Sequence, residues 1–102
     1  MSDAAEMKFS EIRGKGVLSQ DGRELGVVDD LRFDHEQWRI DALIVKLDRE
    51  LLEQFGMKKP MFGTTTIEVE TGLISGVGDK VILHESLDDI SAGYRGQDSS
   101  EG

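Results

Sequence analysis

One apolar run constrains the fold of this chain more than any other stretch of it. Residues 38–47 form the longest apolar segment, and their richness in β-branched side chains favours a strand. The run is too short for a membrane-spanning helix, which needs about 20 residues. Its even-numbered apolar positions share one strand face, yet Leu43, Val45 and Leu47 crowd the opposite face, which begins with two charged residues. We therefore predict a strand that is either bulged or covered on both faces at its far end, and in so short a chain another copy is a natural second cover.

Turn and strand signals on both sides of this run predict a mainly β fold. Gly22 marks a hairpin turn at residues 20–23, because glycine takes a positive φ without a steric penalty. Asp29 falls on the apolar row of the following strand, so we expect it at a strand end, at a bulge or beside a hydrogen-bonding partner. Five or six short strands and one short helix indicate a small antiparallel β-barrel. The predicted strands cover residues 17–19, 24–33, 38–47, 64–70 and 81–84, and the glycine-broken segment at 73–80 leads into the last of them.

Helix signals follow the central run. Asp48 is placed as an N-cap and Gly56 as a C-terminal stop, so residues 49–55 are predicted to form two helical turns. The apolar side chains of this helix and of the preceding strand exceed what one small barrel interior readily takes, which predicts a self-association surface. The alternative is that the helix covers the open end of its own barrel. The residues concerned are Leu43, Val45, Leu47, Leu51, Leu52 and Phe55.

The loop at residues 57–63 is a second candidate surface. It contains the only pair of adjacent lysines, the single proline and three large apolar side chains. We predict that Met61 and Phe62 either fold back onto the barrel or anchor a partner, while Lys58 and Lys59 steer acidic surfaces towards it. The alternative is an ordinary surface loop without a binding role.

Length and composition set further bounds. A chain of 102 residues allows one domain, which we place at residues 7–87 after a flexible segment at 1–6. Without cysteine there is no disulfide and no thiolate zinc site, and without a visible secretory signal a cytoplasmic location is expected. Residues 88–102 are polar and acidic, so we predict a disordered tail. Ile90 and Tyr94, spaced like neighbours on a helix, leave open a tail that orders on binding.

Charge and motif content argue against catalysis and against nucleic-acid binding. The formal net charge is −9, which repels phosphate backbones overall and is consistent with solubility or with a salty cytoplasm. His35 and His84 lie far apart and form no ligand motif, and the adjacent pairs Asp29–Asp30 and Asp88–Asp89 read as a strand segment and a solvated charge run. No nucleophile elbow, phosphate loop or dinucleotide fingerprint occurs. We predict that the protein is not an enzyme and uses no cofactor or metal.

Three segments together resemble a known family. Residues 21–30 (DGRELGVVDD), 38–45 (WRIDALIV) and 75–83 (SGVGDKVIL) are similar, in order and spacing, to the PRC-barrel family, named for the cytoplasmic domain of the photosynthetic reaction-centre H subunit. The resemblance runs from about Ser10 to Leu83. It implies a small β-barrel that serves as a binding module.

The resemblance also implies two settings for such a module. Stand-alone acidic chains are similar to archaeal proteins of the FtsZ-based division machinery, which associate with the membrane-anchoring factor SepF and with each other. By that likeness we expect an adaptor that forms a homodimer or a heterodimer with a paralogue, inserts into no membrane, and reaches the division site through partners. The alternative is a ribosome-assembly or RNA-processing factor like the C-terminal barrel of RimM, whose N-terminal barrel has no counterpart here. The shared motif indicates fold, so no binding residue is carried over.

Overall fold

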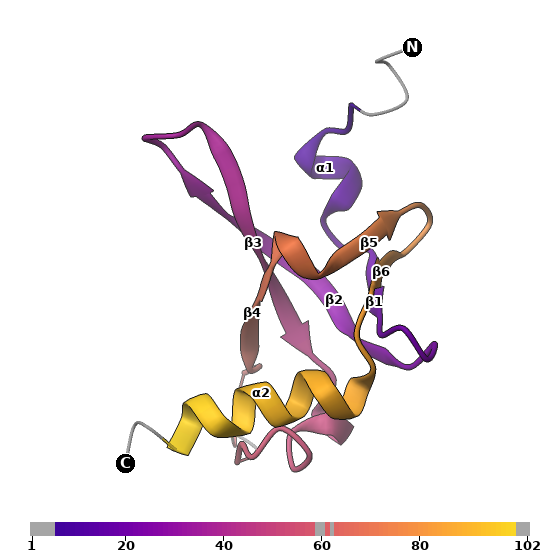
Figure 1. Ribbon diagram of the computed structural model, residues 1–102, viewed down its shortest axis with the longest axis vertical. Helices are drawn as coiled ribbons and strands as arrows, with labels where there is room; N and C mark the ends of the chain where they lie inside the picture. The colour runs from indigo at the N-terminus through magenta and orange to yellow at the C-terminus, as the bar shows by residue number, and fades with distance from the viewer. Residues whose placement is uncertain (1–5, 59–60, 62, 100–102) are drawn as a thin grey trace.

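The computed structural model describes residues 6–58, 61 and 63–99, and it contains a six-stranded sheet and two α-helices (Figure 1). The sheet order is β4-β3-β2-β1-β6-β5. In chain order the elements are α1 (Phe9–Ile12), β1 (Gly16–Leu18), β2 (Glu24–Asp34), β3 (Arg39–Leu47), the 3₁₀ turn η2 (Arg49–Leu51), β4 (Thr66–Glu70), the 3₁₀ turn η3 (Thr71–Leu73), β5 (Ile74–Val77), β6 (Val81–Leu83) and α2 (Leu87–Ser99).

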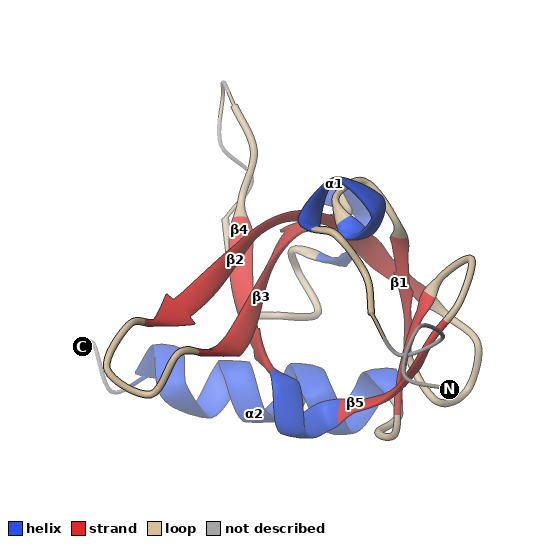
Figure 2. Ribbon diagram, turned by 90° about the horizontal axis from the view of Figure 1, so that it is seen from above, coloured by secondary structure: helices blue, strands red, loops and turns tan. Residues whose placement is uncertain are grey.

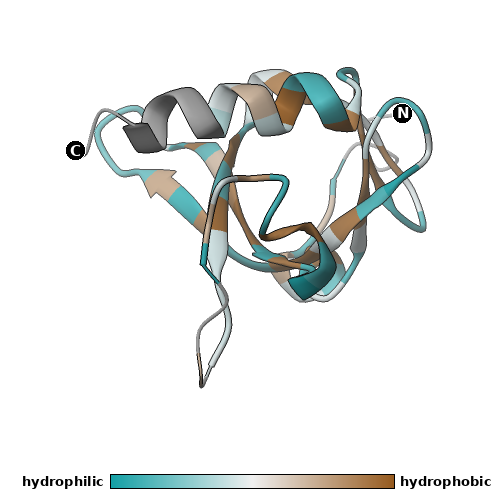
Figure 3. Cartoon of the chain, turned by 90° about the horizontal axis from the view of Figure 1, so that it is seen from below, coloured by the Kyte–Doolittle hydropathy of each residue, from teal (hydrophilic) through white to brown (hydrophobic). Residues whose placement is uncertain are grey.

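The sheet is mixed and open, which confirms the mainly β class but corrects the prediction of an antiparallel barrel. β1 pairs with β6 in parallel, whereas the remaining neighbours are antiparallel. β4 and β5 are the two edges of the sheet. The sheet curls strongly, and α2 lies across its open side (Figures 2 and 3). α2 therefore covers the side of the sheet that pairing between the two edge strands would have closed into a barrel.

The core lies between the concave face of the sheet and α2. Inward side chains of the strands, such as Leu25, Val45 and Val69, are buried together with Leu87 and Ile90 of α2. In Figure 3, apolar (brown) stretches lie both on the strands and on α2. An apolar core shared by strands and helix explains why α2 forms where an unstructured tail was expected from residue 88.

One carboxylate ties the beginning of α2 to the first hairpin. Asp21 accepts hydrogen bonds from the Ser19 hydroxyl and from the Leu87 backbone N–H, the latter at 3.2 Å. The bond from Ser19 is the main reason that the pKa of Asp21 lies below its usual value. The hairpin turn itself is as predicted, since Gly22 has φ +82°. A local turn thus fixes where the C-terminal helix starts.

Two bulges explain the irregular apolar patterns of β2 and β3. Val28 pairs with Val45 and Asp30 with Ile44, so Asp29 has no residue opposite, which confirms one of its expected placements. Arg32 pairs with Ala42 and Phe33 with Ile40, so the register shifts again at Asp41. The central strand is therefore bulged, which was one of the two explanations predicted for its sequence pattern.

The segment after β3 is tighter than the predicted two-turn α-helix. Asp48 caps it by accepting a hydrogen bond from the Glu50 N–H at 3.0 Å, and Gly56 ends it with φ +74°, both as expected. Between them lie the single 3₁₀ turn η2 and a run of hydrogen-bonded turns. This compact geometry inserts two large side chains, Leu52 and Phe55, into the core.

Candidate protein-interaction surface

The structure buries most of the predicted self-association surface within the chain itself. Leu51 is half-buried against the core, and the other five candidates are core residues: Leu43, Val45, Leu47, Leu52 and Phe55. The Phe55 ring packs 5.6 Å from the Tyr94 ring of α2, and the Gln54 amide donates to Asp88 at 2.9 Å. The prediction is corrected accordingly: these side chains belong to or pack against the core that α2 shares, and the alternative in which the segment covers its own sheet is the arrangement observed.

The lysine-containing loop offers one exposed apolar side chain among its described residues. Met61 is 90% exposed and Lys58 is exposed, so neither folds back onto the sheet. The other two candidates from this loop, Lys59 and Phe62, lie outside the described residues.

A larger exposed apolar surface lies on the β2–β3 hairpin, which projects from the body of the molecule (Figure 1). Phe33 is 47% exposed, Trp38 76% and Ile40 40%, and the Phe33 and Trp38 rings meet edge to face at 5.3 Å. We call these three residues the hairpin patch. They were missed as a site from the sequence, although two aromatic residues on either side of a turn were a visible signal.

The bulge at Asp41 makes the hairpin patch a continuation of the core. Opposed residues of an antiparallel pair share a face, so Leu43 lies on the face of Leu31, and Ile40 on that of Phe33. Leu31 and Phe33 are two residues apart on β2 and therefore share one face. The apolar stripe that is buried at Leu43 thus runs outwards along the hairpin and ends uncovered.

The outer part of the hairpin is a two-stranded ribbon. β4 pairs with β3 only from Ala42 to Lys46, and on the other side the described hydrogen bonds reach β2 only as far as Val28. Arg32 holds the base of the ribbon by pairing with Asp41, at 2.9 Å, and with Glu68 of β4. A lone pair of strands is marginally stable, so an uncovered apolar face on it indicates a contact surface.

Trp38 is held in a backbone conformation that large side chains avoid. Its φ is +57°, the only positive φ among the described residues other than glycine. The preceding turn is built by Asp34, whose carboxylate accepts from the N–H groups of Glu36 and Gln37 at 2.9 and 3.3 Å. Glycine or asparagine would fit position 38 with less strain, and strained residues gather at functional sites.

The two histidines and the acidic pairs do not come together to form a binding site. The His84 ring lies 2.7 Å from the Gly72 carbonyl oxygen, and His35 is exposed in the hairpin turn. Within residues 6–58, 61 and 63–99, no group of three or more His, Asp or Glu side chains is arranged to hold a metal ion. Over the same ranges, no helix has the length and apolar character to cross a membrane.

The fold and the exposed surface define the class of protein: a small domain with a curled β-sheet, a covering helix and a projecting apolar hairpin. The PRC-barrel domain model matches residues 5–89, and the chain belongs to the PRC-barrel domain family. The family resemblance predicted from three sequence segments is thereby confirmed. No curated protein matches the chain.

Proposed function

We propose that the protein is a non-catalytic adaptor that binds other proteins through the hairpin patch. The observation that carries this proposal is the exposed and strained Trp38 at the end of an apolar stripe continuous with the core. Large aromatic side chains contribute a disproportionate share of binding energy at protein interfaces. Covering the patch would also stabilise an otherwise unsupported two-stranded ribbon.

The first partner that we propose for this surface is a second copy or a close paralogue. Beyond Val28 the outer edge of β2 carries Asp30, Arg32 and Asp34 on the face opposite the hairpin patch. Antiparallel pairing of two such edges about Phe33 would place each Arg32 opposite an Asp34 of the other copy, with the two Phe33 rings adjacent on the apolar face. Such a pairing is self-complementary in both charge and apolar surface.

For the cellular setting, we propose the archaeal division machinery of the FtsZ and SepF type. Membership of the PRC-barrel family and the acidity of the chain support this proposal. In that setting the protein is cytoplasmic and reaches the division site by contacting a division protein such as SepF.

Light scattering after size exclusion, together with binding assays against purified SepF and FtsZ, tests the proposal. We expect a dimer or a stable complex for the unmodified chain, and its loss in Trp38→Ala and Phe33→Ala. Val77→Ala is the matched control, because Val77 is similarly exposed, at 42%, but lies on β5. A monomer that binds neither protein would contradict the adaptor function. Binding to RNA that weakens steeply as salt rises would favour a ribosome-assembly role instead.

A further inference from the structure

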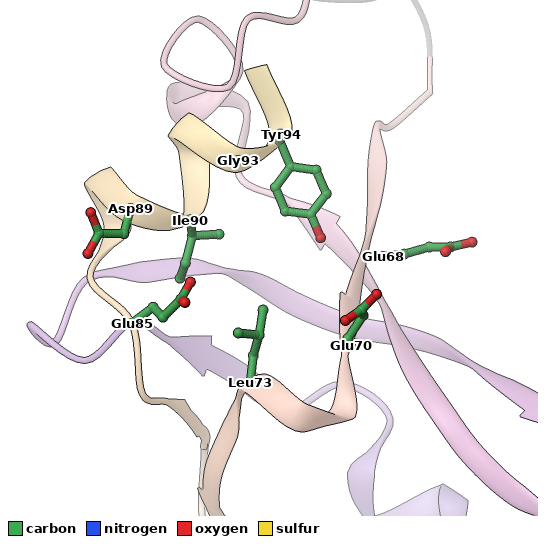
Figure 4. A pocket seen from close by; sticks show the side chains of 8 residues that line it. All are labelled: Glu68, Glu70, Leu73, Glu85, Asp89, Ile90, Gly93 and Tyr94. Carbon is green, nitrogen blue, oxygen red and sulfur yellow. The ribbon is translucent and has the colours of Figure 1, made fainter. Parts of the chain in front are cut away.

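A second surface, separate from the hairpin patch, lies where the edge of the sheet faces α2. A cavity of about 240 Å³ separates β4 and η3 from α2 (Figure 4). Leu73 of η3 and Ile90 of α2 point towards one another across it, and the Tyr94 ring extends from α2 towards β4. These three side chains form the apolar part of the lining.

β4 presents unpaired backbone groups to this cavity. It pairs with β3 on one side only, and its other side is an edge of the sheet. The Leu47 N–H donates to the Thr65 carbonyl oxygen at 2.8 Å, just before β4. In an antiparallel pair, every second residue of a strand forms hydrogen bonds with the same neighbouring strand. Thr65 bonds with β3, so the odd-numbered residues of β4 face β3, and the N–H groups of Glu68 and Glu70 are directed away from it. An extended chain laid beside β4 would find hydrogen-bonding groups there.

The charge of the lining selects the kind of chain that would bind. Glu68, Glu70, Glu85 and Asp89 line the cavity, and no Lys or Arg is among its described lining residues. Burial, together with the carboxylates of Glu68 and Glu70, raises the pKa of Tyr94 to about 12. A second copy, with a net charge of −9, would be repelled by this rim.

We propose that the groove between β4 and α2 binds an extended, positively charged segment of a partner protein, which adds to β4 as a further strand. Residues next to Glu68 and Glu70 on the outer face of the sheet would be Lys or Arg. The residues between them would point to the opposite face, that of the buried Ile67 and Val69, and would be apolar. The partner segment therefore alternates basic and apolar residues, a form of strand addition in which the backbone gives affinity and alternate side chains give selectivity. This site does not depend on the hairpin patch, and together the two surfaces would let one molecule bridge two partners.

A synthetic peptide tests the site on the unmodified protein. The probe is a fluorescein-labelled hexapeptide of alternating lysine and valine, followed by fluorescence anisotropy. Two further versions carry N-methyl groups on the amides of one peptide edge or of the other. Strand addition predicts that one methylated version binds like the parent peptide and that the other binds about tenfold more weakly or worse. Equal binding of both versions, equal loss in both, or no binding of the parent peptide would overturn the proposal.

Substitutions at Glu70 separate strand pairing from charge. Glu70→Pro removes the outward N–H, and the Glu70 φ of −65° already suits proline, so the fold should tolerate it at this edge. We expect about tenfold weaker peptide binding in Glu70→Pro and about threefold weaker binding in Glu70→Gln, which keeps the N–H. Glu36→Gln, the same charge change on the hairpin turn, should leave binding unchanged. If Glu70→Pro and Glu70→Gln weakened peptide binding equally, or if Glu36→Gln weakened it as much as they do, the peptide would be attracted by charge alone and strand addition would be refuted.

Trp38→Ala tests whether the two surfaces are independent. This variant should lose self-association through the hairpin patch and still bind the peptide, so failure of one surface can be distinguished from failure of the other.

Discussion

Substitutions of Trp38 allow the contribution of its strained backbone to stability to be measured separately from the contribution of its indole ring to binding. Trp38 has φ +57° and its ring meets Phe33 at 5.3 Å. The left-handed conformation costs a residue with a Cβ about 1–2 kcal/mol, and an edge-to-face aromatic pair contributes about 0.5–1.5 kcal/mol. In Trp38→Ala the aromatic pair is lost while the strain remains, so we expect a destabilisation of about 1 kcal/mol.

Trp38→Gly should behave differently, because glycine relieves the strain. The relief and the lost aromatic pair nearly cancel, so the glycine variant should be within about 1 kcal/mol of the unmodified protein and about 1–2 kcal/mol more stable than the alanine variant. At an ordinary strand position the order is reversed, with alanine more stable by about 0.5–1 kcal/mol. Both variants should lose partner binding, since both lack the indole ring.

Urea unfolding followed by far-ultraviolet circular dichroism gives the comparison, because the chain has a single tryptophan and both variants remove it. In a domain of this size the expected difference corresponds to about 4–8 °C in melting temperature for each kcal/mol. An alanine variant as stable as the glycine variant, or more so, would refute the positive φ at position 38. Retention of partner binding in both variants would refute the role of the hairpin patch.

Three further outcomes follow from the core, a close contact and a titrating group. Phe55→Ala should lower the free energy of unfolding, measured in urea, by about 3–5 kcal/mol, because Phe55 is fully buried. If the variant instead kept its stability and lost self-association, Phe55 would be an interface residue rather than a core residue. Gly26→Ala should cost about 2–3 kcal/mol because a Cβ there would lie 1.9 Å from the Lys46 carbonyl oxygen, whereas Gly72→Ala, with open space around it, should be near neutral in the same melts. The pKa of Tyr94 is raised from 10.0 to about 12, so the unfolded chain loses its phenol proton at a lower pH than the folded chain does. The free energy of unfolding should therefore be fully present below pH 10 and should fall between pH 10 and 12. Tyr94→Phe, which has no phenol proton, should reduce that fall.

The strands were predictable because their signals are local. Alternation and turn residues placed five of the six strands to within about two residues, whereas β5 lies in the glycine-broken segment for which no strand was predicted. A bulge was one of the three placements expected for Asp29, and it is the one that the structure contains. The family could also be predicted, since its three segments lie in strands and turns. The sequence did not reveal that β1 and β6 pair in parallel, because that contact joins distant segments.

The candidate site was predicted less well, for the same reason. The surplus of apolar side chains around residues 43–55 is present in the sequence, but its cover, α2, was expected to be unstructured. Ile90 and Tyr94 stabilise that helix only by packing on the core, a contribution that no local propensity contains. The hairpin patch was missed because both of its strands look like ordinary half-buried strands until the extent of their neighbours is known.

Periodicity and turn chemistry by themselves determined where most of the strands run, where the chain reverses, and that the central strand is either bulged or covered on both faces. The tertiary structure decided which strand faces are covered, since burial depends on elements distant in sequence. Leu43 is buried in a core that α2 shares, whereas Trp38, farther along the same stripe, is exposed. The physical reason is that strand alternation is a property of backbone geometry over a few residues, whereas exclusion of water requires a second surface brought there by the whole chain.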